Sequence, residues 1–164
     1  MQPTMIAVPP VPTVPAEGGP PLRTRSATPL VVGHWMTAPA KVIAITTPVL
    51  EAYNMMMQWG IRRLPVVEGE RLVGIVTLGD LREARPSPAT SLSVYELNYL
   101  LSKLTVGEVM THNPFTVTPN TTIKEAAGIM LSRKVSGLPV VDDDGRPIGI
   151  ITESDLFRVL VVNG

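Results

Sequence analysis

The strongest constraint on what this chain can fold into is an internal repeat. Short motifs from its first half return in the same order 74 residues later, and after one added loop residue they return at a spacing of 75. So many matches in one register indicate a duplicated supersecondary unit. The matching pairs are Met36-Thr37 with Met110-Thr111, Leu64–Val67 with Leu138–Val141, Gly74–Thr77 with Gly149–Thr152, and Asp80-Leu81 with Asp155-Leu156.

Both copies predict the same order of elements: strand, helix, strand, strand and helix. The first strand is apolar, at Val42–Ile45 in one copy and at Phe115–Val117 in the other. Two apolar runs on either side of a polar, Gly-containing turn then predict a hairpin. A short helix follows, beginning near Leu78 in one copy and near Glu153 in the other. This alternation is typical of an α/β (α+β) fold with two repeats of β-α-β-β-α order.

The first helix of each copy has a recognisable start. Thr47 is expected to cap the helix of the first copy, with Pro48 in the first position, where a missing N–H has no cost. In the second copy Thr122 and Glu125 have capping-box spacing, and Thr121 is an equal candidate for the cap. Apolar stripes at helical spacing predict faces that pack on a core. They are Val49, Ala52, Tyr53 and Met56, and Ile123, Ala126, Ala127 and Met130.

Composition and turn signals divide the chain into four segments. Residues 1–33 are rich in Pro, which fixes φ and removes backbone donors, so we expect a flexible or extended N-terminal arm. Residues 34–84 and 106–164 are the two repeats. Residues 85–105 link them, first through a Pro-containing breaker and then through a helix that Ser93-x-x-Glu96 opens. We expect this connecting helix to pack on the repeats or on a second subunit, through Leu97, Leu100, Leu101 and Leu104.

Charge and cysteine content exclude several classes of function. The 14 basic and 14 acidic residues leave no net charge, which argues against nucleic acids and anionic membrane surfaces as partners. The chain has no cysteine, which excludes disulfides and a Cys nucleophile and fits a reducing cytoplasm. Its N-terminus lacks the pattern of a signal peptide, and no apolar run approaches the ~18 residues that span a bilayer. We therefore expect a cytoplasmic protein without a membrane segment.

Nothing in the sequence indicates catalysis or metal binding. No Ser/His/Asp set and no paired carboxylates stand out. His34 and His112 are 78 residues apart and have no partner at metal-ligand spacing. The acidic run Asp142–Asp144 lacks the rest of a calcium loop and is typical of a turn. We expect neither enzymatic activity nor a metal site.

Taken together, the repeated motifs resemble CBS domains. The resemblance rests on Met-Thr at the start of each copy, Leu-Pro-Val-Val in the middle and Gly-Ile-x-Thr-x-x-Asp-Leu at the end, and it covers about residues 34–162. The chain is similar to small stand-alone bacterial CBS proteins of the acetoin-utilisation type, without the ACT domain that some of them carry. The resemblance implies two repeats packed sheet against sheet with pseudo-two-fold symmetry, a Bateman module. It also implies two sites between them for AMP, ADP or ATP, or for S-adenosylmethionine or NAD.

Two Thr-x-x-Asp motifs are the main candidates for binding. Thr77-x-x-Asp80 and Thr152-x-x-Asp155 open short helices, and each alone is explained as a helix cap with an acidic first turn, worth ~1 kcal/mol. The same geometry suits a nucleotide, because a helix N-terminus attracts phosphate and a carboxylate can accept ribose hydroxyls. By resemblance, Asp80 and Asp155 hold ribose, and Thr77 and Thr152 lie near the phosphates. One threonine can serve both purposes.

The two clefts are not expected to be equivalent. In the CBS family a basic residue two places before the Leu-Pro pair often contacts phosphate, and Arg62 stands there in the first copy. Its counterpart is Ser136, followed by Gly137. The Arg62 side therefore has more charge for a polyphosphate, whereas the Ser136-Gly137 side offers space and backbone donors. Arg62 and Arg63 have an alternative interpretation as a solvated surface pair.

The sequence thus predicts a regulatory sensor that binds an adenine nucleotide between its repeats and signals occupancy to an unidentified protein. By resemblance Ile75 and Ile150 pack on adenine, although each is equally compatible with plain strand core. The apolar helices Val49–Met57 and Ile123–Leu131, with the resemblance, predict a homodimer of face-to-face pairs. The alternatives are a ligand-free dimerisation domain and a nucleic-acid-binding CBS protein, and the zero net charge argues against the latter.

Overall fold

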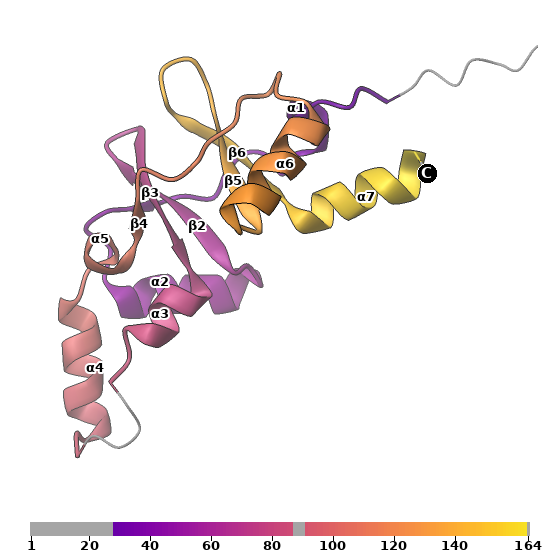
Figure 1. The fold of residues 1–164 in the computed structure, drawn as a ribbon. Helices are drawn as coiled ribbons and strands as arrows, with labels where there is room; N and C mark the ends of the chain where they lie inside the picture. The colour runs from indigo at the N-terminus through magenta and orange to yellow at the C-terminus, as the bar shows by residue number, and fades with distance from the viewer. Residues whose placement is uncertain (1–27, 87–90, 164) are drawn as a thin grey trace, which may run out of the picture.

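The structure is a computed structural model that describes residues 28–86 and 91–163, and Figure 1 shows its helices and strands. The first half contains α1 (Val32–Trp35), β1 (Ile43–Ala44), α2 (Val49–Trp59), β2 (Arg63–Glu68), β3 (Arg71–Thr77) and α3 (Leu78–Glu83). The second half contains α4 (Val94–Lys103), α5 (Val106–Val109), β4 (Thr111–His112), α6 (Ile123–Arg133), β5 (Gly137–Val141), β6 (Pro147–Thr152) and α7 (Glu153–Asn163). The predicted α/β class is confirmed. Most of the predicted arm, residues 1–27, lies outside the described residues.

The two repeats form sheets of the same plan. In the first, the strand order is β1-β2-β3-β4, with β1 parallel to β2 and the other neighbours antiparallel. In the second, β5 and β6 are antiparallel, and single bridges flank them: Val117 pairs in parallel with Val140, and Thr37 pairs antiparallel with Ile150. The predicted first strands are therefore shorter than expected. Only Ile43–Ala44 and the single residue Val117 have strand partners.

Each repeat takes an edge strand from the segment that leads into the other repeat. Thr37 exchanges backbone hydrogen bonds of 2.9 and 3.0 Å with β6 of the second repeat, and β4 pairs reciprocally with β3 of the first. Glycine permits both approaches. A Cβ at Gly149 would lie 2.6 Å from the sulfur of Met36, and one at Gly74 would collide with the sulfur of Met110. The Met-Thr and Gly-Ile motifs recur in the sequence because the Met-Thr of each repeat pairs with the Gly-Ile of the other.

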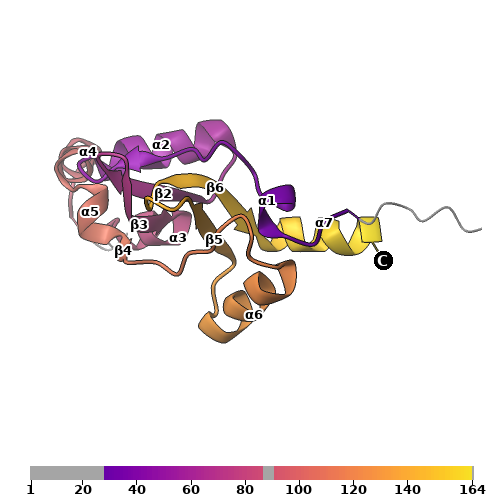
Figure 2. The same ribbon diagram turned by 90° about the horizontal axis from the view of Figure 1, so that it is seen from above.

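The hydrophobic core is divided in the same way. Every buried residue of the first core lies between Ile43 and Met110, on β1, α2, β2, β3, α3, α4, α5 and the residue Met110 after α5. The second core combines Val32 and Trp35 of α1 with residues of α6, β5, β6 and α7. Seen from above in Figure 2, the strands lie between α2 and α6. Each sheet therefore has a helix cover of its own.

The predicted cap of α2 is wrong. Pro48 rather than Thr47 is the N-cap residue, and no side chain caps this end of the helix. The N–H of Val49 instead donates to the carbonyl of Leu104 at 2.8 Å, so the chain that follows α4 satisfies the helix terminus. In the second repeat the capping box at Thr122 is present as predicted.

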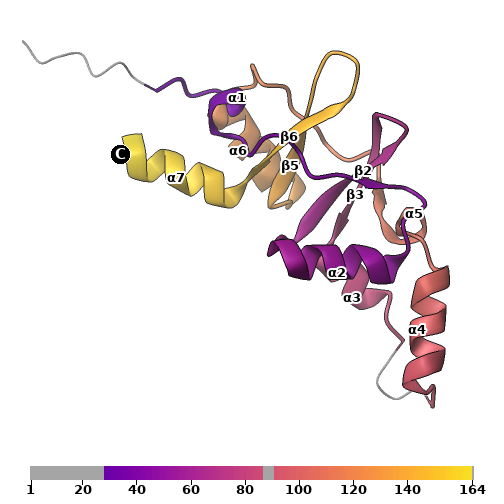
Figure 3. The ribbon, with the colours of Figure 1, turned by 180° about the vertical axis from the view of Figure 1, so that it is seen from behind.

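The connecting helix α4 begins at its predicted capping box. The carboxylate of Glu96 accepts from the N–H of Ser93 at 2.8 Å, and the Ser93 hydroxyl accepts in return at 3.2 Å. Leu101 is buried on the first core, whereas Leu100 is exposed, so the predicted leucine face is only partly covered. The helix contacts α2, and Figure 3 shows it extending beyond α2 and α3. Of the helices in the described ranges, none is long and apolar enough to cross a membrane.

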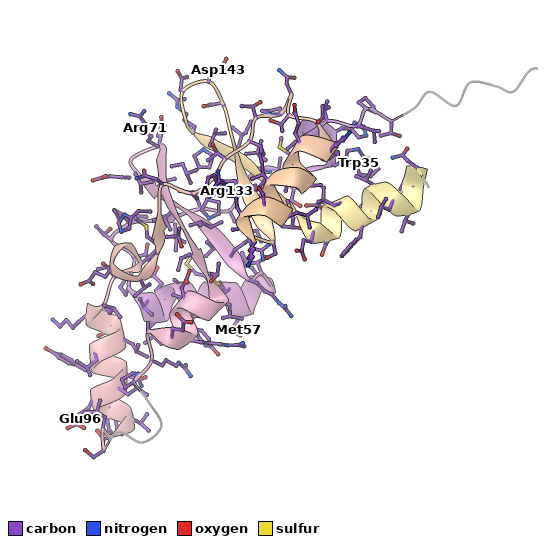
Figure 4. The ribbon with its side chains drawn as sticks, viewed as in Figure 1. Trp35, Met57, Arg71, Glu96, Arg133 and Asp143 are labelled. Atoms are coloured by element: carbon purple, nitrogen blue, oxygen red, sulfur yellow. The ribbon has the colours of Figure 1, made fainter. Side chains whose placement is uncertain are left out.

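The two hairpins touch at their tips, which joins the repeats at one end. Figure 4 labels Arg71 and Asp143, which mark these tips. An exposed ion pair of 3.3 Å connects Arg146 to Glu70. Exposed pairs of this kind contribute little to stability, about 0–1 kcal/mol. The N–H of Leu72 also donates to the carbonyl of Gly145 at 3.1 Å, so a backbone hydrogen bond joins the tips beside this weak ion pair.

Candidate functional site

Two cavities open between the repeats, and residues of both repeats line each one. The first has a volume of about 600 Å³ and is bounded by residues 37–41, the chain after α2, the end of β6 and the start of α7. The second has a volume of about 380 Å³ and is bounded by residues 111–115, the chain after α6 and the end of β3. Below, these are called the first and the second cavity.

The cavities occupy equivalent positions in the two repeats. Thr37 and Ile150 line the first, and their counterparts Thr111 and Ile75 line the second. Both pairs are joined through the exchanged edge strands, Thr37 to Ile150 and Thr111 to Ile75. The walls of each cavity therefore depend on the packing of one repeat against the other.

The structure brings most of the predicted ligand residues to these walls. The exception is Asp80, which is not among the residues that line the second cavity. The roles of all these predicted residues in binding stay predictions. The first cavity is lined by Arg62, Ser136, Ile150, Thr152 and Asp155, and the second by Ile75, Thr77, Ser136 and Gly137.

Both Thr-x-x-Asp motifs cap their helices. In the first repeat, Asp80 Oδ2 accepts from the N–H of Thr77 at 2.8 Å, and the Thr77 hydroxyl accepts from the N–H of Asp80 at 3.2 Å. In the second, Asp155 Oδ2 accepts from the N–H and the hydroxyl of Thr152 at 2.9 and 3.1 Å. Asp155 Oδ1 pairs with Arg158 at 3.3 Å. Asp155 is only 2% exposed, so its carboxylate is a buried anchor of α7 that also reaches a cavity wall.

Sequence reasoning missed Arg63 as a site residue. Its side chain crosses from the first repeat to the second, where Nη1 donates to the carbonyl of Ser136 at 2.9 Å and Nη2 donates to the Ser136 hydroxyl. The space expected beside Gly137 is therefore filled, because a Cβ there would lie 2.5 Å from Arg63 Nη1. Burial lowers the pKa of Arg63, while the charge of Glu153 raises it. The signal in the sequence was that Arg63 and Gly137 are equivalent positions, one long and one without a side chain.

A cation and an aromatic ring meet beside each cavity, with exchanged roles. Lys41 lines the first cavity and lies 4.6 Å from the ring centre of Trp59. Phe115, the counterpart of Lys41, lines the second cavity, and Arg133, the counterpart of Trp59, lies 4.5 Å from its ring centre. The wall of the first cavity thus presents an ammonium group, and the wall of the second presents an aromatic ring.

Comparison with known proteins identifies the repeats. The sequence model of the CBS domain matches residues 32–87 and 106–162. A CBS domain-containing protein of Dictyostelium discoideum is 35% identical over 133 residues, which are 80% of this chain and 92% of the relative. An inosine-5'-monophosphate dehydrogenase of Korarchaeum cryptofilum is 38% identical over 107 residues, 65% of this chain but only 19% of that enzyme. The chain thus matches a minor part of the enzyme and nearly the whole of the Dictyostelium protein.

Solved structures share the fold. CBSX2 in complex with AMP has a TM-score of 0.68 at 32% identity and covers 81% of this chain and 97% of its own. The CBS domain pair of MJ0100, in complex with 5'-methylthioadenosine and S-adenosyl-L-methionine, has a TM-score of 0.65 at 29% identity and covers 79% and 98%. A Vibrio cholerae protein named AcuB, of the acetoin utilization type, has a TM-score of 0.67 at 30% identity and covers 82% and 92%. This chain therefore belongs to the CBS domain family, as a tandem CBS pair.

Proposed function

We propose that this CBS pair is a regulatory module, not an enzyme, that binds an adenosine nucleotide and signals its occupancy to a partner protein. The observation that carries the proposal is the first cavity, where Asp155, Thr152 and Ile150 lie on one wall with several cations. The complexes of CBSX2 with AMP and of MJ0100 with two adenosine derivatives support the ligand class. Cytoplasm remains the proposed compartment on the composition argument, and cell fractionation tests it.

The first cavity is the better site for a phosphate-bearing ligand. Four cations line it, Lys41, Arg62, Arg63 and Arg158, against two carboxylates, Glu153 and Asp155, of which Asp155 is paired with Arg158. The counterpart of Arg62 is Ser136 and that of Arg158 is Glu83, so neither charge has an equivalent at the second cavity, where Lys134 is the cation beside Arg63. In a partly buried site each nearby cation contributes more than in water, because the effective dielectric constant is lower.

The second cavity is the better site for a ligand that binds through its ring. Phe115 is 47% exposed, and the ring face that Arg133 does not cover would stack on a purine. Ile75 lines the same cavity and supplies a second apolar contact. Since Asp80 does not reach this wall, the second cavity is expected to bind ribose less tightly than the first.

A panel of ligands tests the proposal. AMP, ADP, ATP, NAD and S-adenosylmethionine are compared by thermal shift and by calorimetry on the full chain. A ligand at a hundredfold excess over its Kd stabilises the fold by ~2.7 kcal/mol, which is about 5–10 °C for a chain of this size. Absence of a shift with every ligand would favour the ligand-free interaction domain. A salt-dependent mobility shift with RNA or DNA would favour the nucleic-acid alternative.

We also propose that the module is a homodimer. Helix α7 projects from the body of the molecule in Figure 1, and its apolar side chains are uncovered: Phe157 is 62%, Leu160 67% and Val161 83% exposed. A two-fold axis would bury the same face of both copies against itself. Leu160→Glu should then give monomer by light scattering at micromolar concentration, while Glu70→Gln at a hairpin tip should leave the mass unchanged. A wild-type chain that is monomeric throughout would exclude the dimer.

A further inference from the structure

Arg63 stands in the wall between the two cavities, and we infer that it couples them. An anionic ligand in one cavity weakens the binding of a second anionic ligand in the other. This inference rests on the proposed function, because it requires phosphate-bearing ligands. It adds to that function a coupling between the affinities of the two cavities, which the fold alone does not imply.

The lining of the cavities is the first observation. Arg63 and Ser136 are the two residues, in the part of the chain that the structure describes, that line both cavities. They are also joined to each other, since the guanidinium donates to the carbonyl and to the hydroxyl of Ser136. The guanidinium and its hydrogen-bond partner therefore form one unit that faces both ligand spaces.

The asymmetry of this unit is the second observation. Pseudo-two-fold symmetry would place one side chain from position 63 and one from position 137 at the junction of the repeats. Position 137 is glycine, and the contacts of 2.5, 2.9 and 3.1 Å that its Cβ would make with Arg63 show that only one side chain fits. A single guanidinium thus serves two cavities in equivalent positions.

Electrostatics then sets the sign of the coupling. Both hydrogen bonds of Arg63 go to neutral oxygens of Ser136, and Glu153 acts on Arg63 through its charge without a hydrogen bond, so the guanidinium can still turn to a phosphate in either cavity. A phosphate in the first cavity attracts the guanidinium and lowers the positive potential that a second phosphate would meet. Because coupling between two sites is reciprocal, the second ligand weakens the first by the same factor. Couplings of this kind are typically about 5- to 150-fold, and we expect about tenfold here.

Arg62 is the natural contrast to Arg63. It is exposed and lines the first cavity alone. Lys41 also lines only the first cavity. The double variant Lys41→Gln/Arg62→Gln should weaken phosphate binding in the first cavity while it keeps Arg63 itself.

The test uses methyl NMR on the full chain with labelled isoleucines, titrated with AMP and separately with adenosine. Ile150 reports on the first cavity and Ile75 on the second. In the Lys41→Gln/Arg62→Gln variant AMP fills the first cavity only at higher concentration. The second cavity then binds AMP while the first is empty, so the affinity that Ile75 reports should be about tenfold tighter than in the wild type. With adenosine, which has no phosphate, the Ile75 titration should be the same in both proteins. In an Arg63→Gln background the double substitution should no longer change the AMP affinity at Ile75.

The outcomes separate the two proposals. AMP shifts at both reporters, with an Ile75 affinity that the double variant leaves unchanged, would overturn the coupling and leave the sensor intact. An equal tightening with adenosine would also overturn it, because the effect would not depend on phosphate. No shift at either reporter with AMP or adenosine would overturn the adenosine-type sensor and this inference with it. The comparison of AMP with adenosine needs no change at Arg63, so it remains decisive if Arg63→Gln fails to fold.

Discussion

Replacement of the two helix-capping aspartates should reveal how differently the repeats use the same motif. Asp155→Ala removes a side chain that is only 2% exposed and accepts from both donors of Thr152. A hydrogen bond to a charged group is worth about 1.5–3 kcal/mol, and the exposed partner Arg158 adds little. We expect a loss of about 2–3 kcal/mol in the free energy of unfolding. Asp80→Ala removes a less buried cap and should cost about 1 kcal/mol.

Urea denaturation of the ligand-free variants measures these differences. Asp155→Asn keeps one acceptor and should fall between the wild type and Asp155→Ala. On the same samples, calorimetry should show that Asp155→Ala weakens AMP binding at the first cavity ten- to a hundredfold. Equal destabilisation by Asp155→Ala and Asp80→Ala would refute the argument from burial. Unchanged AMP affinity would refute the ribose role while leaving the cap intact.

Two further comparisons follow from the cavity walls. Gly137→Ala should displace Arg63 and cost about 1–3 kcal/mol by overpacking, whereas Gly128→Ala, in open space on α6, should stabilise the chain by about 0.5–1 kcal/mol, as thermal melts would show. Lys41→Ala should weaken AMP more than adenosine, and Phe115→Ala should weaken adenosine as strongly as AMP; calorimetry that finds the same pattern for both variants would contradict the division of the two walls.

The sequence predicted those features that depend on residues close together in the chain. The capping boxes at Ser93 and Thr122 are present because a Ser or Thr and a Glu three residues later carry the whole interaction. The cap at Thr47 failed for the opposite reason. The N–H of Val49 bonds to Leu104, a residue more than fifty positions away that no local rule could supply.

The candidate site shows the same limit. Thr152 and Asp155 were found because they form one local motif, and their place on a cavity wall agrees with the expectation. Arg63 was missed because its contact with Ser136 spans 73 residues and crosses between the repeats. Asp80 was expected, by resemblance to CBS domains, to hold ribose as Asp155 does. Its carboxylate caps its own helix and is not among the residues that line the second cavity, so its role in binding stays a prediction.

The division of the core makes one packing unit an insertion within the other. Every buried residue of the first core lies between Ile43 and Met110, and every one of the second lies outside that interval. Residues 38–112 thus form one continuous inserted unit. The other unit is assembled from the two segments of chain that flank it. During synthesis the inserted unit is complete before the other unit. The N-terminal segment of that other unit, with Val32 and Trp35, can pack only when its partners near the C-terminus have been made. A cut in the linker therefore falls inside the inserted unit and does not separate the two units, whereas a circular permutant that opens near Pro39 would place the inserted unit at one end of the chain.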